Sequence, residues 1–192
     1  MPDSVEMMGP TDAERRQRFS DLYSAHYAMV VAYARRRLPP DSADDAVAET
    51  FMAAWRTFDR LSGDPLLWLY GLARGAVSNQ RRGLTRRSRL RARLDRLAIP
   101  PANSDHAASV GWEDPLLAAL GHLSGAEQEA LQLVAWEDLA VAEAAGVAGC
   151  SVTAFKVRLL RARRHMRRLL ESDALAPTAA ASRCLAVHEE GQ

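Results

Sequence analysis

Residues 136–168 read WEDLAVAEAAGVAGCSVTAFKVRLLRARRHMRR, and within them an acidic, alanine-rich half changes abruptly into a basic half. From Ser151 to Arg168 there are seven positive side chains and no acid. Apolar residues recur over the same positions at spacings of three and four, which is the pattern of a helix with one buried stripe. The predicted stripe is Val152, Phe155, Leu159, Ala162 and Met166.

A short helix and a turn are predicted immediately before the basic helix. Residues 139–148 are mostly small and suit close helix crossing, Gly149 permits a turn, and Ser151 is a good N-cap. Glu137 and Asp138 are expected at the start of the short helix, where carboxylates interact favourably with the helix dipole. A short helix, a glycine turn and a longer basic helix together predict a helix-turn-helix.

The side of the basic helix opposite its buried stripe is the candidate surface for duplex DNA. At about 100° per residue, that side and its flanks carry guanidinium groups that can reach phosphates and base edges in a major groove. The candidate DNA-binding residues are Thr153, Lys156, Val157, Arg161, Arg163 and Arg164. Composition alone leaves a second interpretation open, namely an amphipathic helix whose basic face is only solvated.

Charge is segregated along the chain, although the formal net charge of the 192 residues is only +1. Residues 81–96 hold eight arginines and one acid, whereas residues 97–150 hold eight acids and neither lysine nor arginine. Blocks of opposite charge indicate surfaces for different partners. A composition of 48% hydrophobic but only 6% aromatic residues favours helices over a strand-rich core.

Several functional classes are excluded by what the sequence lacks. No stretch approaches the roughly 20 apolar residues of a membrane span, and no secretory pattern occurs, which predicts a cytoplasmic protein with no membrane partner. Cys150 and Cys184 are too far apart for a zinc or redox pair, and Cys150 is expected to be a small buried residue of the turn. Without metal-ligand spacing, a phosphate loop or a nucleophile elbow, we expect no catalytic residues, metal, cofactor or enzymatic activity.

Three helices are predicted in the N-terminal half. The first follows the helical spacing of residues 19–37, and the second begins at Asp41. The predicted buried stripe of the second helix is Val47, Phe51, Ala54, Trp55 and Phe58. A loop over residues 59–63 leads to a third helix, which opens with Asp64 as N-cap and ends at Arg82. The predicted fold class is all-α, with two small helical domains joined by a flexible linker.

Three segments resemble, in order and spacing, the conserved regions of extracytoplasmic-function (ECF) sigma factors of bacterial RNA polymerase. ADDAVAETFMAAW (43–55) and DPLLWLYGLARGAVSNQRR (64–82) resemble region 2, and DPLLAALGHLSGAEQEALQLVAWEDLAVAEAAG with the basic helix after it resembles region 4. The resemblance implies region 2 (19–82), a linker (83–111) and region 4 (112–170), preceded by an N-terminal tail (1–18). Residues 171–192 are rich in alanine and polar residues and are expected to form a disordered C-terminal tail, which goes beyond the minimal family architecture.

The same resemblance implies a role for each candidate residue. The second helix of region 2 would bind the clamp of the polymerase beta-prime subunit, through Asp45, Glu49, Thr50 and Met52. The following loop and third helix would bind the minus-10 promoter element as it opens, through Leu61, Ser62, Gly63, Trp68, Asn79, Gln80, Arg81 and Arg82. The basic helix of region 4 would bind the minus-35 element as duplex. Core polymerase, including its beta flap, promoter DNA and an anti-sigma factor are the implied partners.

Gly71 and Gly75 depart from the family pattern, because many members have arginine and asparagine at these places. Glycine at position 75 therefore lacks the side-chain amide that would contact a DNA base. Asn79 or Gln80, about one turn further along, is expected to supply this amide. The basic start of the linker is expected either to continue the third helix and touch DNA phosphates or to remain a solvated arginine run. Two other functions stay open at this stage: a helix-turn-helix regulator that works without polymerase, and a helical adaptor for protein–protein interactions.

Overall fold

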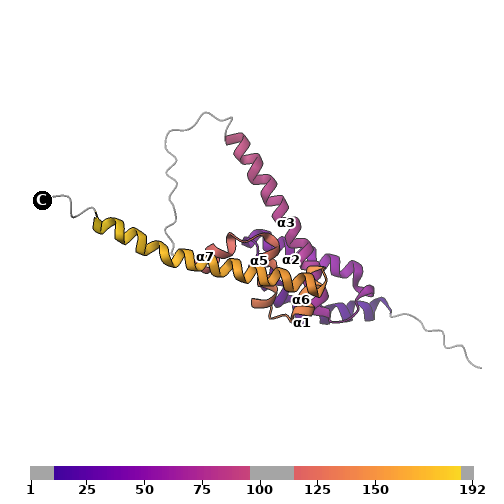
Figure 1. The fold of residues 1–192 in the computed structure, drawn as a ribbon. Helices are drawn as coiled ribbons and strands as arrows, with labels where there is room; N and C mark the ends of the chain where they lie inside the picture. The colour runs from indigo at the N-terminus through magenta and orange to yellow at the C-terminus, as the bar shows by residue number, and fades with distance from the viewer. Residues whose placement is uncertain (1–10, 96–114, 187–192) are drawn as a thin grey trace, which may run out of the picture. The chain divides into compact units, whose positions relative to one another are not determined.

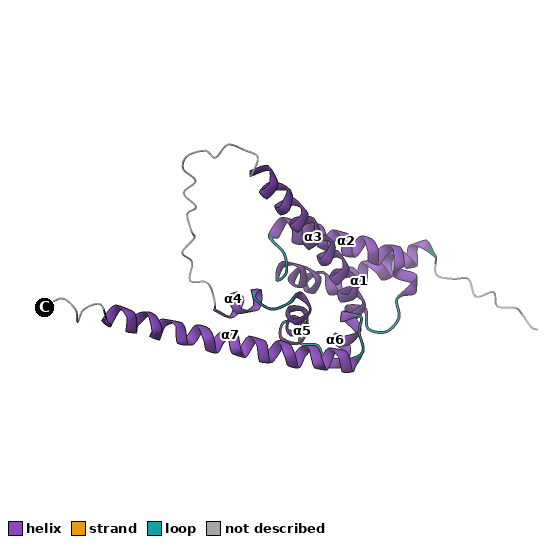
Figure 2. Cartoon of the chain, turned by 45° about the horizontal axis from the view of Figure 1, so that its top comes forward, coloured by secondary structure: helices purple, strands orange, loops and turns teal. Residues whose placement is uncertain are grey.

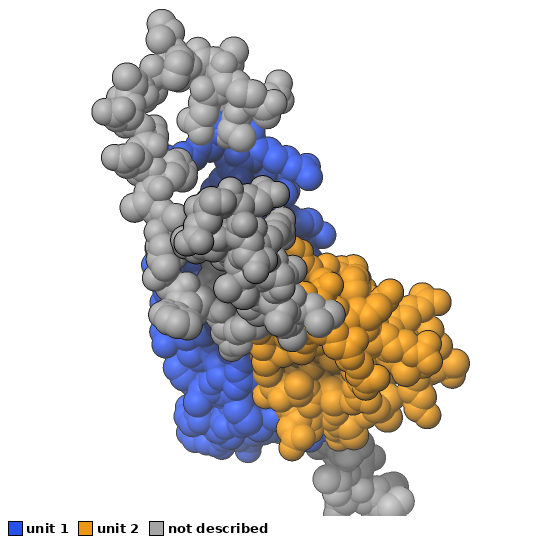
Figure 3. Space-filling model, turned by 60° about the vertical axis from the view of Figure 1, so that its left-hand side comes forward, with its two compact units in different colours: residues 1–100 blue, residues 101–192 orange. Residues whose placement is uncertain are grey.

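The computed structural model describes residues 11–95 and 115–186, and over those ranges every regular element is a helix. Figures 1 and 2 show the helices in their order along the chain. The chain divides into two compact units, residues 1–100 and 101–192, which Figure 3 colours separately. The all-α fold class predicted from the sequence is confirmed.

The first unit contains α1 (Asp12–Arg35), α2 (Pro40–Thr57), the 3-10 helix η1 (Phe58–Arg60) and α3 (Pro65–Asp95). α1 begins earlier than the expected residue 19, because Thr11 and Glu14 form a capping box. The Thr11 amide donates to Glu14 Oε2 at 2.8 Å. Hydrogen bonds from the backbone and side chain of Thr11 lower the pKa of Glu14. Part of the expected N-terminal tail is therefore helical.

Aromatic and small side chains hold α1, α2 and α3 together. Tyr33 of α1 stacks on Tyr70 of α3 with 5.1 Å between ring centroids, and Leu69 is fully buried. Phe19 makes edge contacts with Trp55 at 5.0 Å and with η1 at the end of α2. Trp55 was expected in the buried stripe but is 36% exposed, because it lies at the edge of the α1–α2 contact.

The third helix is longer than the sequence predicts. α3 continues through Gly83 to Asp95, so the first part of the expected linker is helix, whereas 96–111 lie outside the described residues. Arginine has high helix propensity, and no proline interrupts the run. Thr85 also donates its hydroxyl to the carbonyl of Arg81 at 2.9 Å, one turn earlier.

The second unit contains α4 (Pro115–Gly121), α5 (Gly125–Ala135), α6 (Val141–Ala148) and α7 (Val152–Ala186). Phe155 and Ala162 of α7 are fully buried, and α7 packs against α4, α5 and α6. Val152 was expected in the same stripe but is 41% exposed, because it is the first residue of α7.

The predicted helix-turn-helix is present in α6 and α7. Gly149 takes a left-handed conformation with φ of +65°, and Ser151 Oγ accepts a hydrogen bond from the Ala154 amide at 3.2 Å. The expected place of Glu137 and Asp138 was wrong, since both precede α6. Asp138 has φ of +52°, and it is Glu143 that closes the helix start by accepting from the Ala140 amide at 2.8 Å.

α7 also runs further than expected. The sequence predicts a disordered tail from residue 171, whereas the helix extends to Ala186. Residues 174–181 are rich in alanine, the residue with the highest helix propensity, although they also include Pro177, which lacks a backbone donor and disfavours a helix interior. Within the described parts of the chain, no helix is both long and apolar enough to span a membrane.

Candidate nucleic-acid and polymerase interfaces

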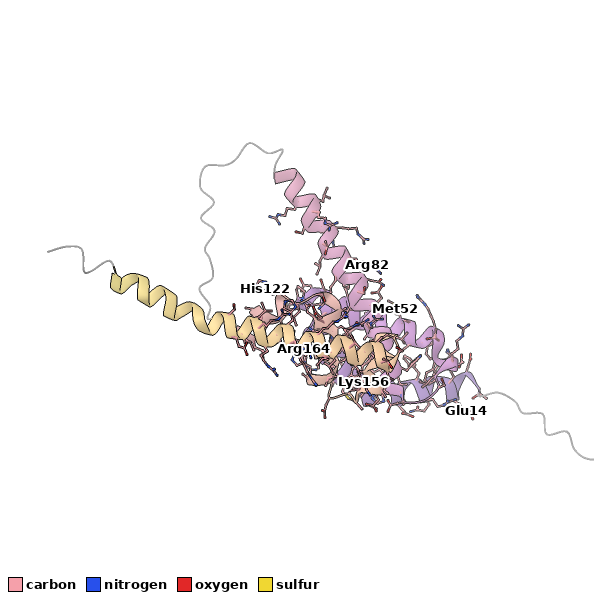
Figure 4. The ribbon with its side chains drawn as sticks, in the orientation of Figure 1. Glu14, Met52, Arg82, His122, Lys156 and Arg164 are labelled. Carbon is pink, nitrogen blue, oxygen red and sulfur yellow. The ribbon has the colours of Figure 1, made fainter. Side chains whose placement is uncertain are left out.

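α7 presents a continuous exposed basic surface, on which Figure 4 labels Lys156 and Arg164. All the residues predicted there to bind DNA are exposed, namely Thr153, Lys156, Val157, Arg161, Arg163 and Arg164. Leu160 is 49% exposed and lies roughly 140° around the helix from Phe155, among these residues. Leu160 was not among the predicted DNA-binding residues, although its helical angle places it on this side. Exposed aliphatic groups on such a surface can contact thymine methyl groups.

Two other side chains of α7 are turned toward α5 and not toward this surface. Arg158 pairs with Glu129 at 3.9 Å, and His165 lies 3.6 Å from Glu127. Glu127 also closes the capping box at the start of α5, where Ser124 donates to its carboxylate. The hydrogen bonds from Ser124, with a smaller contribution from His165, lower the pKa of Glu127. α5 thus fixes the orientation of α7 at two points.

The second unit also contains a free thiol and an open groove. Cys150 is a free, half-buried thiol, so it is less buried than predicted. Among the described residues, no cluster of histidine, cysteine or acidic side chains could hold a metal ion. An open groove between α5 and α7 has an apolar floor and is lined by Leu131, Arg163, Met166, Arg167, Leu170 and Glu171.

The expected polymerase surface on α2 is partly formed. Asp45 and Met52 are exposed, the latter by 52% of its surface. Thr50 is 1% exposed, and its hydroxyl donates to the carbonyl of Ala46 at 2.7 Å. Thr50 is therefore a core residue, and its expected place in an exposed interface is corrected. Its helical position turns it toward the packed side of α2, whereas Met52 points away.

Glu49 lies at the boundary between the two predicted surfaces of the first unit. The Asn79 side-chain amide of α3 donates to Glu49 Oε1 at 3.4 Å, and Arg82 donates to Asn79 Oδ1. Glu49 Oε2 is buried and has no hydrogen-bond partner among the described residues. The structure thus joins a residue expected to bind polymerase to two residues expected to bind DNA, a connection across 30 positions that the sequence did not suggest.

The loop before α3 is shaped by a glycine and a cap. Gly63 has φ of +76°, and Asp64 Oδ1 accepts from the amides of Leu66 and Leu67 at 2.7 and 3.1 Å. This confirms Asp64 as the N-cap. Ser62 and Gly63 are exposed, whereas Leu61 and Trp68 are half-buried. The loop therefore offers polar backbone beside partly accessible apolar side chains.

The remaining predicted residues of α3 face different ways. Asn79 and Arg82 are exposed, and Gln80 is half-buried. Arg81 is also half-buried and donates to the carbonyl of Arg37 at 3.3 Å, which anchors α3 to the end of α1. Arg81 therefore belongs to the packing of the unit, because it lies about 160° around α3 from Asn79.

Gly71 and Gly75 leave the helix backbone bare on the side of Asn79. A Cβ atom built at either glycine would meet no other atom within 4 Å. Packing within the chain therefore does not require glycine at these two positions, and the usual cost of about 1 kcal/mol per glycine in a helix is not offset there by any contact of the free protein.

The second unit is a helix-turn-helix with an exposed basic second helix. The first unit exposes polar and basic groups on a long helix. Together these features define a helical nucleic-acid-binding protein. Residues 22–87 match the family model Sigma-70 region 2, and residues 113–166 match Sigma-70, region 4.

Individual relatives agree with both matches. RNA polymerase sigma factor CnrH of Cupriavidus metallidurans is 29% identical over 193 residues, covering 86% of this chain and 98% of CnrH. The ECF RNA polymerase sigma factor BldN of Streptomyces coelicolor is 30% identical over 178 residues, covering 88% of this chain and 67% of BldN. The sigma factor RpoE of Bartonella quintana, solved in complex with the anti-sigma factor NepR, is 25% identical with a TM-score of 0.60, over 82% of this chain and 99% of RpoE.

The chain belongs to the extracytoplasmic-function sigma factors, which direct bacterial core RNA polymerase to promoters. The comparisons do not favour a polymerase-independent regulator or a helical adaptor. As a class, sigma factors are initiation factors and not enzymes.

Proposed function

We propose a division of labour between the two units of this sigma factor. The first unit binds the polymerase clamp through exposed residues of α2, chiefly Asp45 and Met52. Its loop 61–63 and the exposed side of α3, with Trp68 and Asn79, bind the minus-10 element and stabilise its opened strand. α7 binds the minus-35 element as duplex. One observation carries this proposal. α7, the second helix of a formed helix-turn-helix, exposes a basic surface, and the same chain also matches region 2.

Electrostatics support the assignment of both surfaces. An exposed carboxylate on α2 can attract a basic partner and raise the rate and specificity of association. Guanidinium groups on α7 can replace counterions on DNA phosphates, which makes binding dependent on salt. The groove between α5 and α7 would receive the polymerase flap, because its apolar floor is open and its rim is charged. RNA synthesis itself would remain with the core enzyme, and the protein would act in the cytoplasm.

An anti-sigma factor is a proposed partner of this chain. The support is that RpoE, which is similar over most of both chains, was solved with NepR. An anti-sigma protein would compete with polymerase or DNA for the surfaces described above. Co-purification of the chain from its own cells, followed by displacement with core polymerase, tests for such a competitor.

Two single variants separate the proposed surfaces. Asp45→Arg should abolish core binding while leaving the circular dichroism spectrum unchanged, since exposed substitutions usually alter stability by less than about 0.5 kcal/mol. Arg164→Ala should leave core binding intact and weaken promoter binding, by roughly 1–3 kcal/mol if it contacts a base. Asp21→Arg, an exposed charge reversal on α1, is the control. Normal core affinity in Asp45→Arg, or normal promoter occupancy in Arg164→Ala, would contradict the respective assignment.

A further inference from the structure

The arginine-rich end of α3 is not used by the function proposed above. Figures 1 and 2 show this end projecting past α1 and α2 as one uninterrupted helix. Four of its arginines are exposed, namely Arg86, Arg87, Arg89 and Arg91. No described acid forms an ion pair with any of these four side chains. The end of α3 therefore carries a dense positive charge that the first unit does not neutralise.

Two of these arginines extend the surface formed by Asn79 and Arg82. At about 100° per residue, Arg82, Arg86 and Arg89 lie about 60°, 20° and 80° from Asn79 in one direction around the helix, whereas Arg87 lies about 80° from Asn79 in the other direction. We call these three residues the arginine row. Arg87 and Arg91 lie on the other flank of α3, so they form a natural internal comparison.

The spacing of the arginine row fits a nucleic-acid backbone. At 1.5 Å per residue, Arg82 and Arg89 are about 10 Å apart along the axis of α3, and successive base pairs of a duplex rise about 3.4 Å along the DNA axis, so these long side chains can reach phosphates of neighbouring nucleotides. The planar guanidinium group can donate two parallel hydrogen bonds to a phosphate. A straight helix holds the three groups in a fixed line.

The arginine row does not stabilise the free protein. Like charges at spacings of three and four on a helix repel each other, and the row contains both spacings. Arg87 and Arg91 add another pair of the same kind. A polyanion lying against the helix would remove this repulsion, whereas water and salt only screen it.

We propose that Arg86 and Arg89 bind phosphates of the promoter duplex next to the upstream edge of the minus-10 element. This inference rests on the proposed function, because it takes Asn79 as the reference point on DNA. The minus-10 element is opened and the minus-35 element is bound as duplex, so the DNA leading from Asn79 toward the upstream element begins as duplex. The chain leaves α3 in the same order, from the minus-10 unit to the minus-35 unit.

The test uses the full chain assembled with core polymerase and a promoter fragment selected by the wild-type holoenzyme. Binding is measured over a range of salt concentrations for the wild type and for Arg86→Ala/Arg89→Ala. Each lost phosphate contact should lower the slope of log affinity against log salt by about 1, so the double variant should lose up to about 2. Arg86→Lys/Arg89→Lys should keep most of the slope, since a lysine also neutralises a phosphate.

Position on the DNA is tested with uncharged methylphosphonate linkages placed directly upstream of the minus-10 element. They should weaken binding of the wild type but not weaken Arg86→Ala/Arg89→Ala further. Arg87→Ala/Arg91→Ala removes the same charge from the other flank and should remain sensitive to these linkages. An unchanged slope in Arg86→Ala/Arg89→Ala, or equal behaviour of the two double variants, would overturn the proposal.

Core affinity distinguishes DNA from the polymerase as the partner. If Arg86→Ala/Arg89→Ala lowered core affinity while the salt slope on promoter DNA stayed the same, the row would be a polymerase contact and the proposal would be wrong. Failure of the proposed function would give a different experimental result from failure of the arginine-row proposal. A wild-type chain that bound no core polymerase would contradict that function, whereas a deficit confined to the arginine variants concerns only the row.

Discussion

Individual cations of α7 have different roles that composition could not separate. Arg158 lies about 60° from Phe155 around the helix and reaches Glu129 on α5, so it belongs to the packing edge. Lys156, Arg161 and Arg164 are exposed on or beside the opposite side. The exposure of this set could be predicted from the sequence, because the helical angle determines which side of α7 each residue faces. The partner of Arg158 could not be predicted, since α5 and its orientation lie outside that local pattern.

Glu49 shows the same limit in the first unit. The resemblance to region 2 implied that it contacts polymerase, and the fold also brings it to Asn79 of α3, a contact that the sequence did not suggest. With Arg82 on the other side of the amide, Asn79 is held from both ends. These two hydrogen bonds set the orientation of the Asn79 amide in the free protein.

This arrangement predicts energetic coupling between Glu49 and Asn79. In the holoenzyme, Glu49→Ala should weaken binding of single-stranded minus-10 DNA by several-fold, because a lost hydrogen bond costs about 0.5–1.5 kcal/mol and more for a charged partner. Asn79→Ala should have an equal or larger effect, and the double variant should be no worse than Asn79→Ala alone. Filter binding on short single strands measures this. Strictly additive losses would show that Glu49 acts on its own, as a direct polymerase or DNA contact.

Helix ends were the elements in which sequence reasoning succeeded and failed most clearly. Asp64 and Ser151 were predicted as caps and both accept the expected amide hydrogen bonds. Glu137 and Asp138 were misplaced, because acids at a helix start and acids in a preceding turn have the same local pattern. The deciding interaction is the Leu139 amide donating to the Leu133 carbonyl at 3.2 Å, which ties the turn back to α5.

The cap of α5 predicts a measurable pH dependence. The folded pKa of Glu127 is below its ordinary value of 4.5, so the stabilisation is fully present above that value and is lost as the pH falls through the folded pKa. Ser124→Ala should raise the pKa of Glu127 toward 4.5 and destabilise the second unit by about 1 kcal/mol at pH 7. Carboxyl NMR titration and thermal unfolding measure the two effects. A Glu127 pKa unchanged by Ser124→Ala would mean that the backbone amide of residue 124 or His165, and not the Ser124 hydroxyl, lowers it.

The two glycines of α3 predict a gain in stability. Gly71→Ala and Gly75→Ala should each stabilise the first unit by up to about 1 kcal/mol, because the added Cβ meets no atom and the unfolded chain loses freedom. For a unit of this size each change should raise the melting temperature by about 4–8 °C. Ala76→Gly, at a buried position of the same helix, is the opposite control and should lower it. A lower melting temperature in either alanine variant would indicate a contact that the free chain does not show.

The order of modules along the whole chain could be predicted, because three motifs occur in the order of regions 2 and 4. The lengths of α3 and α7 could not, since both run past the motifs into sequence that resembled a linker and a tail. Arginine and alanine favour helix without specifying a tertiary contact, so local propensity accounts for the extension of α3, whereas the extension of α7 passes through Pro177 and propensity alone does not explain it. The first of these extensions places the arginine row on α3. The sequence alone did not decide whether these arginines contact DNA or are only solvated.

Promoter opening is the step that requires the whole molecule, and it gives the last prediction. Unstacking a base costs a few kcal/mol, so the isolated chain should bind promoter duplex weakly. Core polymerase should supply the fixed separation of the two units that opening requires. Replacing residues 61–63 by a scrambled sequence should therefore spare core binding and minus-35 contacts but block the open complex. Permanganate footprinting detects the unpaired thymines directly, and the same loop change in the free protein should leave the α-helical circular dichroism signal intact. If the bubble formed normally with the scrambled loop, melting would have to be assigned to another part of the first unit, with the exposed side of α3 as the next candidate.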